Sequence, residues 1–150
     1  MSVGPIPAPS GTTNCSPKVN RATATEFELH SPAKVSNFII GELRTGGQLA
    51  FIVENLPKDG TGCPGKWMFN EMMNHFGSSV TGVYGFWVGA ISDNLKEVNR
   101  LTAAGRPLEE AAKNTWTGKR AADWGYNQVQ VLATEGATGG YTKVHVLFER

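Results

Sequence analysis

Three stretches in the first half of the chain carry the hydrophobic patterns of β-strands. Over residues 23–30, apolar and polar side chains alternate with a period of two, which predicts a half-buried strand. Apolar runs rich in β-branched and aromatic residues at Val35–Leu43 and Gln48–Val53 predict two more strands. The connecting stretch Arg44–Gly47 ends in two glycines, which tolerate the positive φ of a tight turn. The two strands are therefore expected to form a hairpin.

Helical spacing replaces this pattern in the middle of the chain. Apolar residues recur at intervals of three and four over residues 66–76, which predicts an amphipathic helix. Before the next helices, the aromatic and glycine-rich run Thr81–Gly89 is compatible with a buried strand. Capping and stop signals then predict a helix from Ser92 or Asp93 to about Ala104, one after Pro107, and one over Gly118–Trp124. Thr117 is expected to cap the last of these helices.

The clearest alternation lies near the end of the sequence. It covers residues 128–131 and then Tyr141–Phe148, and the stretch Thr134–Gly140 between them is expected to be a long hairpin loop. Strands, helices and a closing hairpin in this order predict an α+β fold. Its expected form is a small antiparallel sheet with helices packed on one face and a C-terminal β-hairpin.

Length and composition limit the number of domains that the chain can form. A chain of 150 residues is long enough for about one domain with its own core. Residues 1–20 are rich in Pro, Gly, Ser and Thr and have no apolar periodicity. They predict a flexible arm or linker, followed by a single α+β domain over residues 21–150. Cys15 and Cys63 are too few for a zinc site, and they can either pair as a disulfide or stay free.

The charge balance excludes some classes of function. A net charge of +1 is incompatible with a bulk polyanion-binding tail but leaves a local basic site open. No apolar run is long enough for a transmembrane helix, so no membrane partner is expected. The first residues show no basic-then-apolar order, so no signal peptide of the chain's own is expected.

His145 is the first candidate for chemistry, because histidine alone titrates near neutral pH without help. The strand pattern places it opposite Val144 and Val146, in line with Lys143 and Tyr141. A base, a cation and a phenol on one face suit phosphoryl transfer, in which His145 moves the proton and Lys143 stabilises the developing charge. The alternative is a solvated outer sheet face, of which polar alternation is equally typical.

The other two histidines have simpler interpretations. His30 ends a strand and shares a face with Glu28, which could orient it as a base; alternatively, it simply begins the next loop. His75 lies in the last turn of its predicted helix, where a cation complements the helix dipole, and it is expected to be structural. No spacing such as HExxH marks a metal site, so neither a metal nor another cofactor is expected.

The segment Thr117–Arg120 is the second candidate site. If Thr117 caps a helix, the amides of Gly118, Lys119 and Arg120 converge beside two cations, an arrangement that holds phosphate. The segment is not a P-loop, because the upstream glycine at the required spacing is missing. Trp116 beside it is expected to stack on a base. An ordinary helix cap with surface cations is the alternative.

Two segments of the last third carry a resemblance. They are Thr115-x-Thr117-Gly118-Lys119-x-x-Ala122-x-x-Gly125-Tyr126 and Gly140-Tyr141-Thr142-x-Val144-x-Val146-x-Phe148. Through these residues, and over 108–150 at most, the chain resembles the C-terminal toxin domains of bacterial polymorphic toxins of the Rhs-associated and contact-dependent inhibition type. The resemblance implies secretion on, or delivery by, a carrier protein into the cytoplasm of a target cell. It also implies a cognate immunity protein as partner.

Many domains of that kind are metal-independent ribonucleases, so the resemblance and the residues together predict an antibacterial toxin that cleaves RNA. In this hypothesis His145 is the general acid and base, and His30 is a second proton carrier. Lys143 and Lys119 hold phosphate, and Thr117 orients it.

Two alternatives belong to other classes. The first is an ADP-ribosyltransferase or NAD glycohydrolase toxin, which would recruit Arg44 together with Glu135 or Glu149. The second is a non-enzymatic structural or binding module of a secretion or phage particle. The aromatic run Tyr84–Trp87 would suit the packed interface of such a module.

Overall fold

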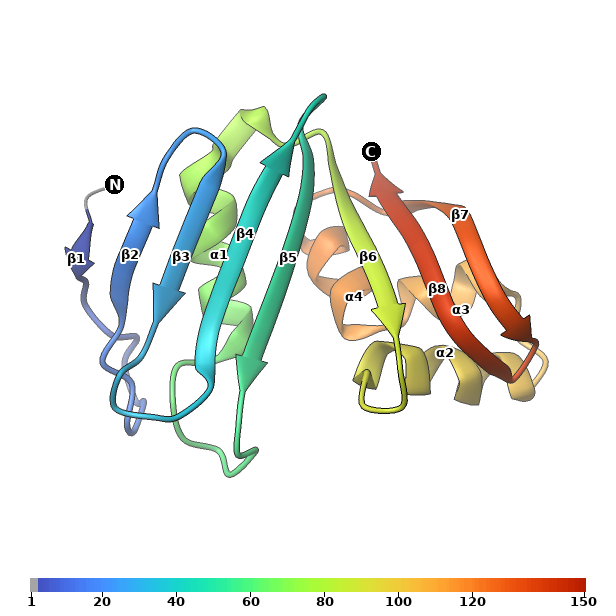
Figure 1. Cartoon of the computed structure of the whole chain (residues 1–150), viewed down its shortest axis with the longest axis horizontal. Coiled ribbons are helices and arrows are strands. Elements are labelled where there is room, and N and C mark those ends of the chain that lie inside the picture. Colours follow the sequence, from blue (N-terminus) through green and yellow to red (C-terminus); the bar gives the residue numbers. More distant parts are fainter. Residues whose placement is uncertain (1–2) are drawn as a thin grey trace. The chain divides into compact units, whose positions relative to one another are not determined.

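The computed structural model describes residues 3–150 of the chain (Figure 1). These residues form two compact units, which divide after Val80: unit 1 ends there and unit 2 covers Thr81–Arg150. Each unit combines an antiparallel sheet with helices, which confirms the predicted α+β class. The expectation of one domain over residues 21–150 stays a prediction.

Unit 1 contains an antiparallel meander, in which strands that follow one another in sequence pair with one another. The strands are β1 (Gly4–Pro5), β2 (Lys18–Ala22), β3 (Glu26–His30), β4 (Asn37–Arg44) and β5 (Gln48–Asn55). The predicted strands are confirmed with shifts of a few residues at their ends. The predicted β4–β5 hairpin also forms: Gly46 and Gly47 have φ of 83° and 82°, and the Gly47 amide donates to the Arg44 carbonyl at 3.0 Å.

One face of this sheet packs on α1 (Gly65–Phe76), which continues into the short 3-10 helix η1 (Gly77–Ser79). The predicted amphipathic pattern is confirmed, because every apolar position of that pattern is buried. The core of unit 1 is formed by Phe27, Leu29, Ile39, Leu49, Met68, Phe69, Met72 and Met73.

The segment before β2 is attached to unit 1. Residues 18–20, expected at the end of a flexible arm, belong instead to β2, and Val19 is fully buried. Cys15 forms a disulfide with Cys63, the first of the two outcomes that the sequence left open. The buried Asn37 side chain fixes the Cys63 end: its Oδ1 accepts from the Cys63 amide at 2.6 Å, and its Nδ2 donates to the Cys63 carbonyl at 3.0 Å.

Unit 2 contains a three-stranded antiparallel sheet of β6 (Gly82–Val88), β7 (Gln128–Ala137) and β8 (Gly140–Glu149), with β8 in the centre. The strand expected at Thr81–Gly89 and the closing hairpin are confirmed. The long loop expected over Thr134–Gly140 is wrong, because β7 continues to Ala137. Two irregularities in the register of β7 carry the strand through this glycine-containing stretch.

Three helices cover one face of the unit 2 sheet: α2 (Asp93–Ala103), α3 (Leu108–Lys113) and α4 (Trp116–Asp123) (Figure 1). The Ser92 hydroxyl caps α2 by accepting from the Leu95 amide at 3.2 Å, as one of the two predicted caps. Val144, Val146 and Phe148 point towards these helices and are fully buried. The opposite face, here called the open face, carries the exposed Phe86 and Val88 and the half-buried His145 and Lys143, whereas Leu147 on the same face is buried.

Candidate functional site

The register of the three strands maps the residues of this open face. They are Tyr84, Phe86 and Val88 on β6, Lys143, His145 and Leu147 on β8, and Gln130, Ala133 and Glu135 on β7. His145 lies at the centre, directly opposite Phe86 on one side and Ala133 on the other. The predicted alternation of β8 is therefore confirmed, with His145 and Lys143 on the face opposite the buried valines.

Two aromatic rings contact the His145 imidazole. The Tyr84 ring lies at a centroid distance of 5.2 Å and is tilted by 32°, and the Phe86 ring lies at 5.3 Å and nearly perpendicular, at 88°. The imidazole is half-buried by these contacts, whereas Phe86 keeps 60% of its surface exposed. The open face thus presents an imidazole in contact with two aromatic rings, and the Phe86 ring is mostly exposed to solvent.

The electrostatic partner of Lys143 is the carboxylate of Glu135. The two residues are directly opposite on β8 and β7, and their Nζ and Oε1 atoms are 3.4 Å apart. The Glu135 side chain is 66% exposed. The Lys143 side chain is 28% exposed. A pair that solvent reaches at the carboxylate is worth about 1 kcal/mol, so an incoming phosphate can compete with Glu135 for the Lys143 ammonium.

Tyr141 shares the strand but not the neighbourhood of His145. Four residues of extended chain separate the two by about 13 Å. The Asn99 side chain holds the Tyr141 backbone from both sides, accepting from its amide at 2.7 Å and donating to its carbonyl at 3.0 Å. Tyr141 also lines a cavity of about 240 Å³ beside α2. Of the three predicted groups, only the His145 base and the Lys143 cation are therefore neighbours, and the Tyr141 phenol is not part of the site.

The remaining histidines both lie in unit 1. The Asn20 side chain contacts Nδ1 of His30 and donates to Oε1 of Glu28 at 3.4 Å, so an amide lies where the sequence predicted a direct Glu28–His30 pair. The Nε2 of His75 bonds the Thr23 carbonyl at 2.6 Å, and its ring stacks on Phe27 at 5.2 Å. These contacts agree with the structural role expected for His75.

The helix cap expected at Thr117 is wrong by two residues. Thr115 caps α4, because its Oγ1 accepts from the Gly118 amide at 3.0 Å. The Lys119 amide donates to the Thr115 carbonyl at 3.0 Å, and Thr117 and Gly118 are buried. The amides of Gly118 and Lys119, which the expected phosphate site needed, are already bonded within the helix. The threonine two positions earlier has the same capping chemistry, and the sequence does not distinguish the two.

The other members of this expected site have local partners. The Arg120 guanidinium bonds Asp123 Oδ2 at 2.9 Å and lies over the Trp116 ring at 5.6 Å from its centroid. Thr117 Oγ1 accepts from the Asn94 side chain at 2.9 Å, which ties α4 to α2. Lys119 is exposed. The segment therefore has the contacts of a helix junction, and a role of Lys119 in holding phosphate stays a prediction.

Replacing the cap residue with Thr115→Ala is expected to lower the free energy of unfolding by about 2 kcal/mol. The fully buried hydroxyl donates to the Ala112 carbonyl at 2.7 Å as well as accepting from Gly118. Its loss leaves the buried Gly118 amide without its partner, whereas the Ala112 carbonyl keeps the bond from the Thr115 backbone amide at 3.2 Å. Urea unfolding followed by circular dichroism measures the change. The exposed Thr142→Ala is the control, with an expected change within about 0.5 kcal/mol, and equal stability of the two variants would contradict the assigned cap.

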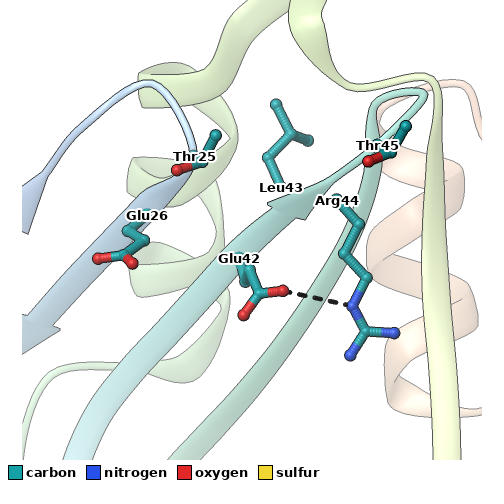
Figure 2. Close-up of a pocket in the computed structure, with 6 residues that line it drawn as sticks. All are labelled: Thr25, Glu26, Glu42, Leu43, Arg44 and Thr45. Carbon is teal, nitrogen blue, oxygen red and sulfur yellow. Dashed lines mark ion pairs between the residues drawn. The ribbon is translucent and has the colours of Figure 1, made fainter.

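A second hollow lies in unit 1 and contains none of the predicted catalytic residues. Figure 2 shows the residues that line it: Thr25, Glu26, Glu42, Leu43, Arg44 and Thr45. Arg44 pairs with Glu42 at 3.6 Å, and Glu26 pairs with Arg21. Both carboxylates thus have a guanidinium partner, and no histidine or cysteine is among the described lining residues. A ligand in the hollow could contact the Arg44 guanidinium, but both neighbouring carboxylates are already paired with a guanidinium.

The aromatic partners of His145 are the part of this site that sequence reasoning missed. Tyr84 and Phe86 were recognisable as strand residues, but only the pairing of β6 with β8 places them beside the imidazole. Within residues 3–150, no three His, Cys, Asp or Glu side chains gather as they would to hold a metal ion. No helix in the same range is long and apolar enough to cross a membrane. Comparisons with protein-family models, curated proteins and solved structures find no match to the chain.

Proposed function

We propose that the chain is an antibacterial toxin domain that cleaves RNA without a metal ion, with His145 as the proton-transferring group. One observation carries the proposal. His145 lies at the centre of the open face of unit 2, with Lys143 two residues along the same strand and exposed aromatic surface beside it. An imidazole, an ammonium and an aromatic ring are the groups that proton transfer, phosphate binding and base binding respectively require.

The proposed reaction is an internal transfer at the phosphodiester. The ribose 2′-oxygen attacks the adjacent phosphorus while His145 accepts the proton of the 2′-hydroxyl. The bond from phosphorus to the 5′-oxygen breaks, and the imidazolium returns a proton to that oxygen. The products are a 2′,3′-cyclic phosphate and a free 5′-hydroxyl. Lys143 stabilises the negative charge on the phosphorane after releasing Glu135.

The setting of the toxin follows from the resemblance of residues 108–150. In this proposal a carrier delivers the domain into the cytoplasm of a target cell, and a cognate immunity protein protects the producing cell. His30 keeps the role of a second proton carrier only as a hypothesis, because its ring is engaged by Asn20 in unit 1. Thr117 and Gly118 are no longer assigned to phosphate, because both are buried.

Controlled expression of residues 1–150 in bacterial cells tests the proposal, with growth followed and total RNA separated on a gel. Growth arrest with discrete RNA fragments is the expected result. His145→Ala should slow cleavage by roughly 10²- to 10⁴-fold, which is the usual contribution of a general acid–base residue. Circular dichroism must show that the variant is folded. The exposed Ile52→Ala in unit 1 is the control and should cleave at the original rate.

Undiminished cleavage by folded His145→Ala would overturn the assignment of the base. Growth arrest with intact RNA would favour NAD consumption or ADP-ribosylation, for which the next variants are Arg44→Ala, Glu135→Ala and Glu149→Ala. Folded protein that causes no arrest would favour the non-enzymatic binding module. The binding module is also supported by a specific observation: Phe86 and Val88 expose 60% and 45% of their surface and could pack against a partner.

A further inference from the structure

We propose that Phe86 and Tyr84 form a stacking platform that binds an unpaired base of single-stranded RNA next to His145. The inference rests on the proposed function, because it names the form of RNA that reaches the catalytic imidazole. It concerns binding, whereas the proposed function concerns cleavage, and the two can be tested separately.

Phe86 is an aromatic residue that lies mostly outside the core of unit 2. Phe86 is 60% exposed, whereas Trp87, its neighbour on the helix side of β6, is 5% exposed. Trp87 packs on Phe148 with a centroid distance of 6.3 Å and so contributes to the core of unit 2. The Phe86 ring contacts His145 but leaves most of its own surface to solvent, which is the arrangement of a ring that stacks on a ligand.

The aromatic rings and the phosphate-binding groups lie side by side on the sheet. The near-perpendicular contact of Phe86 with His145 is edge-to-face, so the two rings do not stack face to face. The Tyr84 ring also contacts the imidazole, at a centroid distance of 5.2 Å. A base stacked on Phe86 places its own ribose and phosphate close to His145, and Lys143 lies in the next row of the same face.

An exposed aromatic ring favours single-stranded RNA over duplex RNA as the ligand. Bases in a duplex are stacked on one another, so their faces are not available to a protein ring, whereas unpaired bases stack readily on aromatic side chains of an open sheet. The face carries two groups that can contact phosphate, the His145 imidazole and the Lys143 ammonium, and one carboxylate, Glu135, which pairs with Lys143 at 3.4 Å and must give way to the phosphate. This charge pattern suits a short segment of strand better than the length of a duplex.

Binding of a 2′-O-methylated RNA oligonucleotide tests the platform, because this probe has no 2′-hydroxyl and cannot be cleaved by the proposed reaction. Its affinity is measured by fluorescence anisotropy at fixed salt. Phe86→Ala should weaken binding by roughly 10- to 100-fold, as expected for the loss of one stacked base. Phe86→Trp should restore it. Ile52→Ala is the matched control, since Ile52 is 61% exposed, and it should bind within about twofold of the original protein.

The outcomes separate the platform from the proposed function. Binding that depends on Phe86 but is accompanied by no cleavage of natural RNA would support the platform and overturn the ribonuclease. Cleavage and binding that both survive in Phe86→Ala would overturn the platform and leave the ribonuclease standing. Equal affinity for the same sequence as a duplex would also overturn the platform. No binding of any oligonucleotide would overturn the platform as well.

Discussion

Gly118→Ala is expected to destabilise unit 2 by about 4 kcal/mol or more, the range reserved for severe steric conflicts. A Cβ at this position would lie 2.3 Å from the carbonyl oxygen of Ala112 and 2.7 Å from that of Lys113. Both are backbone atoms near the end of α3, so they cannot move without separating α3 from α4. A loss of this size is a large share of the roughly 5–15 kcal/mol that stabilises a typical domain.

The measurement is urea unfolding of the purified variant, followed by circular dichroism. Ala122→Gly in the exposed part of the same helix is the control, and it should cost about 1 kcal/mol through helix propensity alone. A Gly118→Ala protein as stable as this control would show that α3 and α4 do not approach each other as described. In the proposed toxin, Gly118→Ala should also abolish growth arrest, because the face that carries His145 belongs to the same unit.

Opening the Cys15–Cys63 disulfide is expected to destabilise unit 1 by about 4 kcal/mol, through the freedom that the unfolded chain gains over a loop whose ends are 48 positions apart in sequence. The effect should appear in two ways, by adding a reductant to the original protein and by the double replacement Cys15→Ala/Cys63→Ala. Urea unfolding with and without reductant measures both. The double variant is its own control, since its stability should not respond to the reductant.

Counting free thiols by mass spectrometry is the measurement that could contradict this prediction. Two free thiols in protein purified under oxidising conditions, together with no effect of reductant on stability, would contradict the disulfide. A confirmed disulfide would in turn favour maturation in an oxidising compartment, because such bonds do not persist in a reducing cytoplasm. That inference agrees with the secretion proposed above, but it does not depend on the ribonuclease.

Local patterning was sufficient to predict most of the secondary structure, because the relevant signals are short in range. The period-two alternation of β3 and β8 and the helical spacing of α1 each reflect burial on one face of the element itself. The open side of β8 was found in the same way, and with it His145 and Lys143. The hairpin at Gly46 and Gly47 was equally predictable, since the turn needs residues that adopt positive φ.

The remaining features depend on contacts between distant parts of the chain. Nothing in the run Tyr84–Trp87 shows that β6 pairs with β8, so the rings around His145 could not be placed. Thr115 and Thr117 are equally good caps in isolation, and the choice between them depends on where α3 ends. The partner of Cys15 depends on the path of residues 3–17 along unit 1, for which the composition of that stretch gives no guidance.

The central position of β8 in unit 2 has a consequence for the order in which the protein becomes active. β6 and β7 each pair with β8, which lies between them in the sheet but follows both of them in the sequence. During synthesis β6 and β7 therefore leave the ribosome before the strand that joins them, whereas the strands of unit 1 pair with the strand just made. A nascent chain that lacks β8 has neither His145 nor the sheet that carries it. If the chain acts as proposed, interrupted synthesis would thus release a fragment that lacks the catalytic face and cannot harm the cell that makes it.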